Sequence, residues 1–281
     1  VTGVQTCALP ISDRVTLGST VDVTHDRKTR SFMIVGSTEA DPSGDPPKIS
    51  NESPLGASLI GARIGEDKIP ASSSRTLLLP LGSCEQHGPH LPLATDTLIA
   101  TALVQRVADV VDVDVAPPLP YGASGEHAGF PGLLSLGNDA LERVVLELLR
   151  SARATWPRVV VVSGHGGNVT AVQRALAVAR YEGSDVAAWF PTWRDGDPHA
   201  GAVETSVMWA LDSTWVRHES FVDAPVTEGE MGLVRERGIM AVSPSGVLGS
   251  PHRATPEWGQ EILQHWVDEI VALVQGQGER T

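Results

Sequence analysis

Cysteine is scarce in this chain, whose 281 residues include only Cys7 and Cys84. Two cysteines exclude a disulfide scaffold and a cysteine-rich zinc module. No apolar run approaches the roughly 18 residues that cross a bilayer, and the first residues lack the pattern of an export signal. Basic residues are also few, since 21 Lys and Arg against 34 Asp and Glu give a net charge of −13, which would repel a phosphate backbone. We therefore expect a cytoplasmic protein that binds neither nucleic acid nor membrane.

Downstream of residue 70, short strand-like runs alternate with helix-like runs. The apolar run Thr76–Leu81 and the β-branched run 159–162 are typical of strands that are buried on both faces. The spacing of apolar residues predicts helices over 96–111, from Asn138-Asp139 as the N-cap onward, and over 171–181, 201–211 and 258–275, with further strands at 111–116 and 185–190. This alternation predicts an α/β fold with three layers, α/β/α, around a mostly parallel sheet.

Residues 13–70 have a different pattern of short strands and turns, which predicts a small β-rich fragment. The segments LGSTVDV (17–23), FMIVGSTEADP (32–42) and KISNESPLGASLIGARIGEDKI (48–69) resemble the C-terminal domain of the Gre transcript-cleavage factors, which implies an FKBP-like fold. Residues 1–12 resemble translated adapter sequence. We therefore interpret 1–12 as non-native, 13–70 as a Gre-like fragment and 71–281 as a separate domain, brought together by a chimeric join. An RNA-polymerase-binding module through 13–69 is the alternative function that this resemblance leaves open.

The strongest chemical signal directly follows the first predicted strand, in the segment GSCEQHGPHLPLATD (82–96). It contains Glu85, His87 and Asp96, and carboxylate together with imidazole suits Zn, Fe(II) or Mn. A thiol nucleophile at Cys84 is the alternative, because Glu85 and His87 lie close to it in sequence. The neighbouring carboxylates would raise the pKa of that thiol, so a small packing residue is the better interpretation of Cys84.

Two further loops carry polar residues after predicted strands. The run 159–162 continues into SGHGGN, which contains His165 and Asn168, and DPHAGAVETS (197–206) contains His199 and Glu204. Because the carboxyl ends of parallel strands lie at one edge of a sheet, we expect these side chains to meet the first loop there. Taken alone, Glu204 is also explained as a helix-capping carboxylate, and the SGHGGN loop as a glycine-rich turn.

Counting charges favours two metal ions over one. If Glu85, Asp96 and Glu204 all ligate, with His87 and His165, then two divalent cations, three carboxylates and one bridging hydroxide sum to neutrality. A single divalent ion would leave buried negative charge uncompensated. The sequence therefore predicts a two-metal site bridged by Asp96, which would lower the pKa of a shared water and polarise a carbonyl group.

These three motifs resemble the creatininase family of metal-dependent amidohydrolases, over about residues 74–281. The resemblance implies hydrolysis of a C–N amide bond with two divalent metal ions, Zn, Fe(II) or Mn. The implied metal ligands are Glu85, His87, Asp96, His165 and Glu204. Creatininases proper have Tyr-Glu where this chain has Gly166-Gly167, which argues against creatinine as the substrate and assigns the fifth ligand to Glu204.

Within the family, the segments GEHAGFPG (125–132), DPHAGAVETS and AVSPSGVLGSP (241–251) are most similar to the member of the mycofactocin system. That likeness implies a peptidase that releases a C-terminal dipeptide from the mycofactocin precursor peptide and acts as a homo-oligomer. A small cyclic amide or a formamide is the alternative substrate.

We expect His199 to relay a proton to the leaving nitrogen, since a neutral imidazole can do so near pH 7, with Glu126 as a second catalytic residue. The residues expected to contact substrate are His127, Asn168 and Trp193. The alternatives are a hydrogen bond at the helix start for His199, pinning of the loop for Glu126 and His127, and core packing for Trp193.

Overall fold

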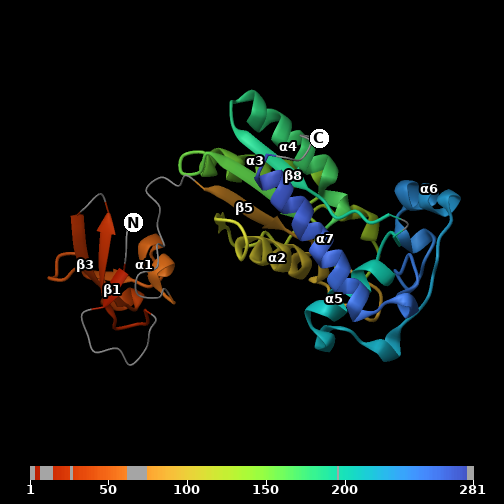
Figure 1. The fold of residues 1–281 in the computed structure, drawn as a ribbon, viewed down its shortest axis with the longest axis horizontal. Helices are drawn as coiled ribbons and strands as arrows, with labels where there is room; N and C mark the ends of the chain where they lie inside the picture. The colour runs from red at the N-terminus through yellow and green to blue at the C-terminus, as the bar shows by residue number, and fades with distance from the viewer. Residues whose placement is uncertain (1–3, 7–14, 26–27, 62–74, 195, 277–281) are drawn as a thin grey trace. The chain divides into compact units, whose positions relative to one another are not determined.

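Figure 1 shows the computed structural model of the chain, which describes residues 4–6, 15–25, 28–61, 75–194 and 196–276. The chain forms two compact units, Val1–Ser73 and Ser74–Thr281. The predicted domain boundary at residues 70 and 71 lies outside the described residues. Each hydrophobic cluster is built from the residues of one unit.

The first unit contains a four-stranded sheet in the order β1-β2-β3-β4. Its elements are β1 (Val4–Thr6), β2 (Thr20–His25), β3 (Lys28–Val35), the 3₁₀ turn η1 (Ser37–Glu39), β4 (Lys48–Ser50) and α1 (Pro54–Leu59). Neighbouring strands pair antiparallel except β3 and β4, which are parallel. Val21, Ile34 and Leu59 are the fully buried centre of its small core. The β-rich character is as expected, whereas β1 and α1 were not assigned from the sequence.

The second unit is built on a parallel sheet in the order β6-β5-β7-β8. Its strands are β5 (Thr76–Leu81), β6 (Val113–Val115), β7 (Arg158–Ser163) and β8 (Asp185–Trp189). Both faces of the central strands are buried, since alternate side chains enter two different cores. Leu78, Val160 and Val162 belong to one core, and Leu77, Leu79, Val159 and Val161 to the other.

Helices cover both faces of this sheet and form the outer layers (Figure 1). One core receives side chains from α2 (Thr95–Ala108), α5 (Ala202–Leu211) and α7 (Pro256–Val274), and the other from α3 (Asn138–Ala152) and α4 (Val169–Tyr181). The predicted three-layer α/β/α fold is therefore confirmed. The helix starts differ from the prediction by one or two residues, and for α3 and α7 the N-cap explains the difference. Gly137, with φ of 73°, is the N-cap of α3 in place of Asn138 or Asp139, and α7 begins at Pro256 because the Thr255 side chain accepts a hydrogen bond from Trp258 N.

One further helix, α6 (Glu228–Arg237), was not predicted from the sequence. Only Val234 is buried in it, so no apolar face marks it, although a capping box between Thr227 and Glu230 fixes its start. The remaining 3₁₀ turns of this unit are η2 (Gly125–His127), η3 (Gly166–Asn168), η4 (Ser213–Trp215), η5 (His218–Ser220), η6 (Ile239–Ala241) and η7 (Pro251–Arg253). In the described part of the chain, every helix is too short or too polar to cross a membrane.

Candidate functional site

Polar side chains from four segments meet at the carboxyl edge of the parallel sheet. Glu85 and His87 follow β5, Asp96 lies in the first turn of α2, and His165 follows β7. His199 and Glu204 lie just before and within the first turns of α5. The first turn of α2 packs directly on both strand ends, because a Cβ at Gly82 would collide with Thr97 and one at Gly164 with the carbonyl of Asp96. This close approach places Asp96 between the two strand-end loops.

The side chains form two triplets that share Asp96. Glu85, Asp96 and His165 offer one set of ligand atoms within 4.8 Å of one another, and His87, Asp96 and Glu204 offer a second. His165 Nδ1 lies 3.2 Å from Glu85 Oε1 and 3.4 Å from Asp96 Oδ2. His87 Nε2 lies 3.1 Å from Asp96 Oδ1 and 4.0 Å from Glu204 Oε2. Asp96 therefore presents one oxygen to each triplet, as a bridging carboxylate does.

Backbone carbonyl groups orient both histidines of the triplets. His87 Nδ1 lies 3.3 Å from the carbonyl oxygen of Glu85, and His165 Nε2 lies 3.2 Å from that of Ala123. A carbonyl can only accept, so these contacts place the N–H on the outer nitrogen of each ring. In the neutral form of each ring, the nitrogen with the lone pair then faces the carboxylates, which is the arrangement of a metal-binding imidazole.

Several carboxylate oxygens at the centre have no hydrogen-bond donor. Glu85 is fully buried, and among the described residues its Oε2 has no hydrogen-bond donor, while His127 Nε2 lies 2.9 Å from its Oε1. Asp96 Oδ2 also lacks a donor there. Buried carboxylate oxygens left in this way are costly, and a cation satisfies them. Oxygen and nitrogen donors in this number fit Zn, Mn or Fe(II).

The pKa values also indicate that the buried carboxylates of the cluster favour a neighbouring positive charge. Burial would raise the pKa of Glu85, but His165, His127 and His87 outweigh it and hold the pKa below its ordinary value. Burial would lower the pKa of His87 and of His165, yet the carboxylates around them raise it to about 9 and about 10. Burial raises the pKa of Glu204, and the nearby Asp96 adds to this. Protons thus compensate the carboxylates here, and divalent ions would displace those protons.

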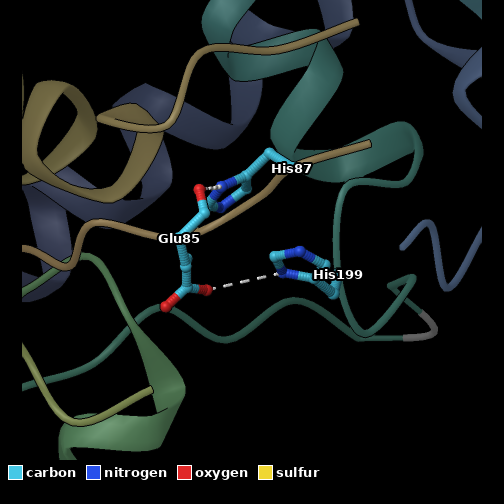
Figure 2. A group of neighbouring side chains, drawn as sticks. All are labelled: Glu85, His87 and His199. Atoms are coloured by element: carbon cyan, nitrogen blue, oxygen red, sulfur yellow. Dashed lines mark hydrogen bonds and ion pairs between the residues drawn. The ribbon is translucent and has the colours of Figure 1, made fainter. Parts of the chain in front are cut away.

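His199 is the remaining imidazole of the cluster, and Figure 2 shows it with Glu85 and His87. Its Nε2 lies 2.8 Å from the carbonyl oxygen of Gln86, so Nε2 carries the proton. Nδ1 faces the cluster, 3.9 Å from both Glu85 Oε1 and Glu204 Oε2. Burial and the positive neighbours His87 and His127 lower the pKa of His199 well below its usual value. A neutral ring with an inward lone pair can accept a proton or bind a cation.

Gln86 is a positioning residue that the sequence analysis missed. Its Oε1 accepts a hydrogen bond from Gly88 N at 2.7 Å, which identifies Nε2 as the amide donor. Nε2 lies 3.1 Å from His127 Nδ1 and 3.1 Å from the carbonyl oxygen of Gly246. Gln86 therefore holds the rings of His127 and His199 in place. Its position between Glu85 and His87 in the strand-end loop is the sequence feature that indicates a role in the site.

A cavity of about 830 Å³ opens beside the cluster. Glu126 and His127 of η2 line it, together with His165, His199 and Glu204. Glu126 Oε1 lies 3.2 Å from His165 Nε2. Burial would raise the pKa of Glu126, but the hydrogen bond and charge of His165 keep it lowered. Glu126 is thus an ionised carboxylate between the cluster and the cavity.

The structure does not bring Asn168 or Cys84 to this cavity. Asn168 is buried, where its Oδ1 accepts from Ala123 N at 2.8 Å and its amide donates to the carbonyl of Gly82 at 3.1 Å, so it ties two loops together. Cys84 Sγ lies 3.7 Å from the carbonyl oxygen of Gly132, and burial raises the pKa of its thiol. These contacts favour a packing role for Cys84 over a nucleophilic one.

Trp193 also lies outside the large cavity. Its ring packs edge-on against Trp258 and His265, with centroids 6.3 and 5.3 Å apart. It lines a smaller cavity of about 140 Å³, which Glu204 also borders.

The sequence matches the creatininase family, described as creatinine amidohydrolase, over residues 66–274, and the chain therefore belongs to that family. Residues 10–69 match the C-terminal domain of the transcription elongation factors GreA and GreB. Membership makes the second unit an amidohydrolase, a hydrolase that acts on C–N bonds.

Two relatives illustrate the range of the family. A mycofactocin precursor peptide peptidase of Mycolicibacterium smegmatis is 46% identical over 202 residues, covering 68% of this chain and 81% of that protein. Creatinine amidohydrolase of Pseudomonas putida is 30% identical over 239 residues, covering 73% of this chain and 90% of that protein.

Solved structures give the same fold. A mutant creatininase described as Zn-Zn type is 28% identical, with a TM-score of 0.63 over 73% of this chain and 91% of its own. A manganese form of creatininase is likewise 28% identical, with a TM-score of 0.62 over the same shares of the two chains. Similar enzymes have therefore been solved with zinc and with manganese.

Proposed function

We propose that the second unit is a metal-dependent peptidase that releases a C-terminal dipeptide from the mycofactocin precursor peptide. The observation that carries the proposal is the pair of triplets joined by Asp96 at the edge of an 830 Å³ cavity. That cavity lies in the range of about 300–1,000 Å³ that holds drug-sized ligands, which is more room than a small cyclic amide needs. The 46% identity to a mycofactocin precursor peptide peptidase supports the same substrate.

In this proposal the five predicted ligands would hold two divalent ions. Glu85, Asp96 and His165 would hold one, and His87, Asp96 and Glu204 would hold the other. Such ions supply Lewis-acid polarisation of a carbonyl group and a water of lowered pKa. Zn, Mn and Fe(II) all suit this donor set.

The chain's own residues orient the substrate and move the proton. His199 accepts a proton at Nδ1, which faces the cluster, and passes it to the leaving nitrogen. Glu126 fixes the ring of His165 through Nε2 and borders the substrate cavity as an ionised carboxylate. His127, held by Gln86, contacts the substrate from the same turn. Substrate contacts of Asn168 and Trp193 stay predictions.

A small cyclic amide or a formamide is the second candidate substrate. The 30% identity to a creatinine amidohydrolase favours it. Gly166-Gly167 in place of the Tyr-Glu of creatininases, together with the size of the cavity, favours the peptide.

The test measures metal content and cleavage on the full chain. A peptide ending in Val-Tyr is incubated with purified protein, and the released dipeptide is detected by mass spectrometry, with creatinine as the comparison substrate. We expect about two metal ions per chain, dipeptide release, loss of release after exhaustive chelation and recovery with zinc or manganese. Cleavage that survives demetallation, or faster turnover of creatinine than of the peptide, would overturn the proposal.

We propose in addition that the protein acts in the cytoplasm as a homo-oligomer, and that residues 1–12, 13–70 and 71–281 are three parts of different origin. The match of residues 10–69 to the GreA/GreB C-terminal domain supports the division. It also supports RNA-polymerase binding as the second candidate function of the first unit. Sedimentation of the purified chain, with and without RNA polymerase, tests both the oligomer and this alternative.

A further inference from the structure

The wall of the large cavity formed by α6 carries two arginines. Arg235 and Arg237 line the cavity and are exposed, and Glu236 lines it as well. The ion pairs of the described arginines involve Arg75, Arg150, Arg158 and Arg174. Within the described residues, neither Arg235 nor Arg237 lies within ion-pair distance of a carboxylate. Two guanidinium groups without carboxylate partners thus border the active-site cavity of a chain whose net charge is −13.

The end of α6 is fixed against the turn that carries Glu126. A Cβ at Gly238, whose φ is 81°, would lie 2.8 Å from the carbonyl oxygen of Glu126, so helix and turn are in close contact. The arginines occupy the last turn of α6, immediately before this contact. Cationic side chains in the last turn also interact favourably with the negative end of the helix dipole. That effect does not require them to line a cavity. Their position beside η2 places them on the substrate side of the cluster.

The chemistry of these groups selects a carboxylate. A guanidinium group forms charge-assisted, often bidentate, hydrogen bonds with a carboxylate and keeps its charge at any physiological pH. We propose that Arg235 and Arg237 form the subsite that binds the terminal carboxylate of a peptide substrate. This inference rests on the proposed peptidase function and specifies that the cavity binds the C-terminal end of the peptide.

Such a subsite would explain the length of the released product. Two extended residues span about 7 Å, so a carboxylate held at the α6 wall sets which amide bond reaches the cluster. A neutral cyclic amide carries no carboxylate that this subsite could bind. By binding the terminal carboxylate, the arginines would place the amide bond that precedes the last two residues at the cluster. Internal peptide bonds, which have no carboxylate at that distance, would not be cleaved.

The test compares one peptide with a free terminal carboxylate and the same peptide as its terminal amide. A charge-assisted hydrogen bond is expected to contribute roughly 10- to 150-fold in affinity, which corresponds to about 1.5–3 kcal/mol. We expect the full chain loaded with zinc or manganese to show a KM at least about tenfold higher for the amide. Arg235→Ala and Arg237→Ala should each raise KM for the free acid with little change in kcat, and leave KM for the amide nearly unchanged. Arg143→Ala, an exposed arginine on α3, is the matched control and should behave as the unaltered chain.

The outcomes separate this inference from the proposed function. If the acid and the amide are cleaved equally well, the peptidase function stands and the carboxylate subsite is wrong. If neither is cleaved, the function fails, and the subsite is still tested by calorimetric titration of the protein with a dipeptide and its amide. The acid must then bind more tightly, and Arg235→Ala and Arg237→Ala must abolish the difference. Equal binding of the two dipeptides overturns the inference.

Discussion

Glu126 occupies the space that a side chain on Gly167 would need. A Cβ at Gly167 would lie 2.5 Å from Glu126 Oε1 and would also collide with Nε2 of His165. The carboxylate that reaches His165 therefore comes from the turn η2, and the residue two positions after the histidine must stay without a side chain. Glycine at position 167, the second of the Gly-Gly pair, is thus a requirement of this arrangement of Glu126.

Replacement of Gly167 by alanine should damage the site. We expect Gly167→Ala to displace Glu126 or His165 and to lower metal affinity and turnover by about 10- to 100-fold, the usual effect of disturbing a ligand's partner. Gly166→Ala is the matched control, because a Cβ there meets no atom within 4 Å, and should keep turnover within about twofold. Metal titration and steady-state kinetics measure both effects. Equal behaviour of the two variants would contradict the close packing around Gly167.

Metal stoichiometry should depend on which triplet is altered. Glu85→Gln and Glu204→Gln each remove a carboxylate from one triplet, so each variant should retain about one ion per chain. Asp96→Asn weakens both triplets and should retain less than one. Asp139→Asn, at a fully exposed carboxylate on α3, should retain both ions. Elemental analysis after dialysis checks this order, and loss of a single ion in Asp96→Asn would show that Asp96 does not bridge.

Acid should destabilise the second unit in part through His90. Burial, with the charges of His87, Arg217 and His252, lowers the pKa of His90 to about 4, and its Nε2 lies 2.9 Å from Thr205 Oγ1. Between pH 6.5 and 4 the unfolded chain binds a proton at this ring that the folded chain excludes. The contribution of neutral His90 to the free energy of unfolding is therefore complete above pH 6.5 and is lost as the pH falls toward 4.

His90→Gln should reduce this loss. We expect the free energy of unfolding to fall less between pH 6.5 and 4 in the variant, by on the order of 1–3 kcal/mol. Denaturant unfolding at fixed metal concentration measures it. An unchanged pH dependence would mean that His90 titrates alike in both states.

Removal of the first unit should leave the enzyme intact. Within the described residues, the two large cores are built from residues of the second unit, from Leu77 to Leu273. We therefore expect residues 71–281 alone to unfold cooperatively and to keep kcat/KM within about threefold of the full chain. Failure of this fragment to fold would count against a join of two unrelated parts.

Strong local patterns made the sheet and the gathering of polar side chains at its edge predictable. The runs 76–81 and 159–162 are apolar on both faces, and such strands require a parallel sheet whose carboxyl edge collects the following loops. That topology brings the loops of Glu85 and His165 together, and the close packing of α2 on both strand ends adds Asp96, although 69 positions separate Asp96 from His165 in the chain.

Other features depend on tertiary contacts that leave little trace in the sequence. Helix α6 buries only Val234, so its apolar period is too weak to predict. Gly137, with its positive φ, is the N-cap of α3. The sequence instead favours Asn138 or Asp139 for this position, because Asn and Asp are common N-cap residues. Asn168 was expected to contact substrate, but a buried amide serves equally well to tie loops, and only the three-dimensional structure shows its partners.

The cluster and the α6 wall come from different stretches of chain. Strand ends and helix starts between Glu85 and Glu204 supply the proposed ligands, whereas a short polar helix lines part of the cavity. Substitutions in that helix can therefore accumulate without disturbing the chemical machinery. Replacement of that one segment is therefore a direct route to altered substrate selectivity in this chain.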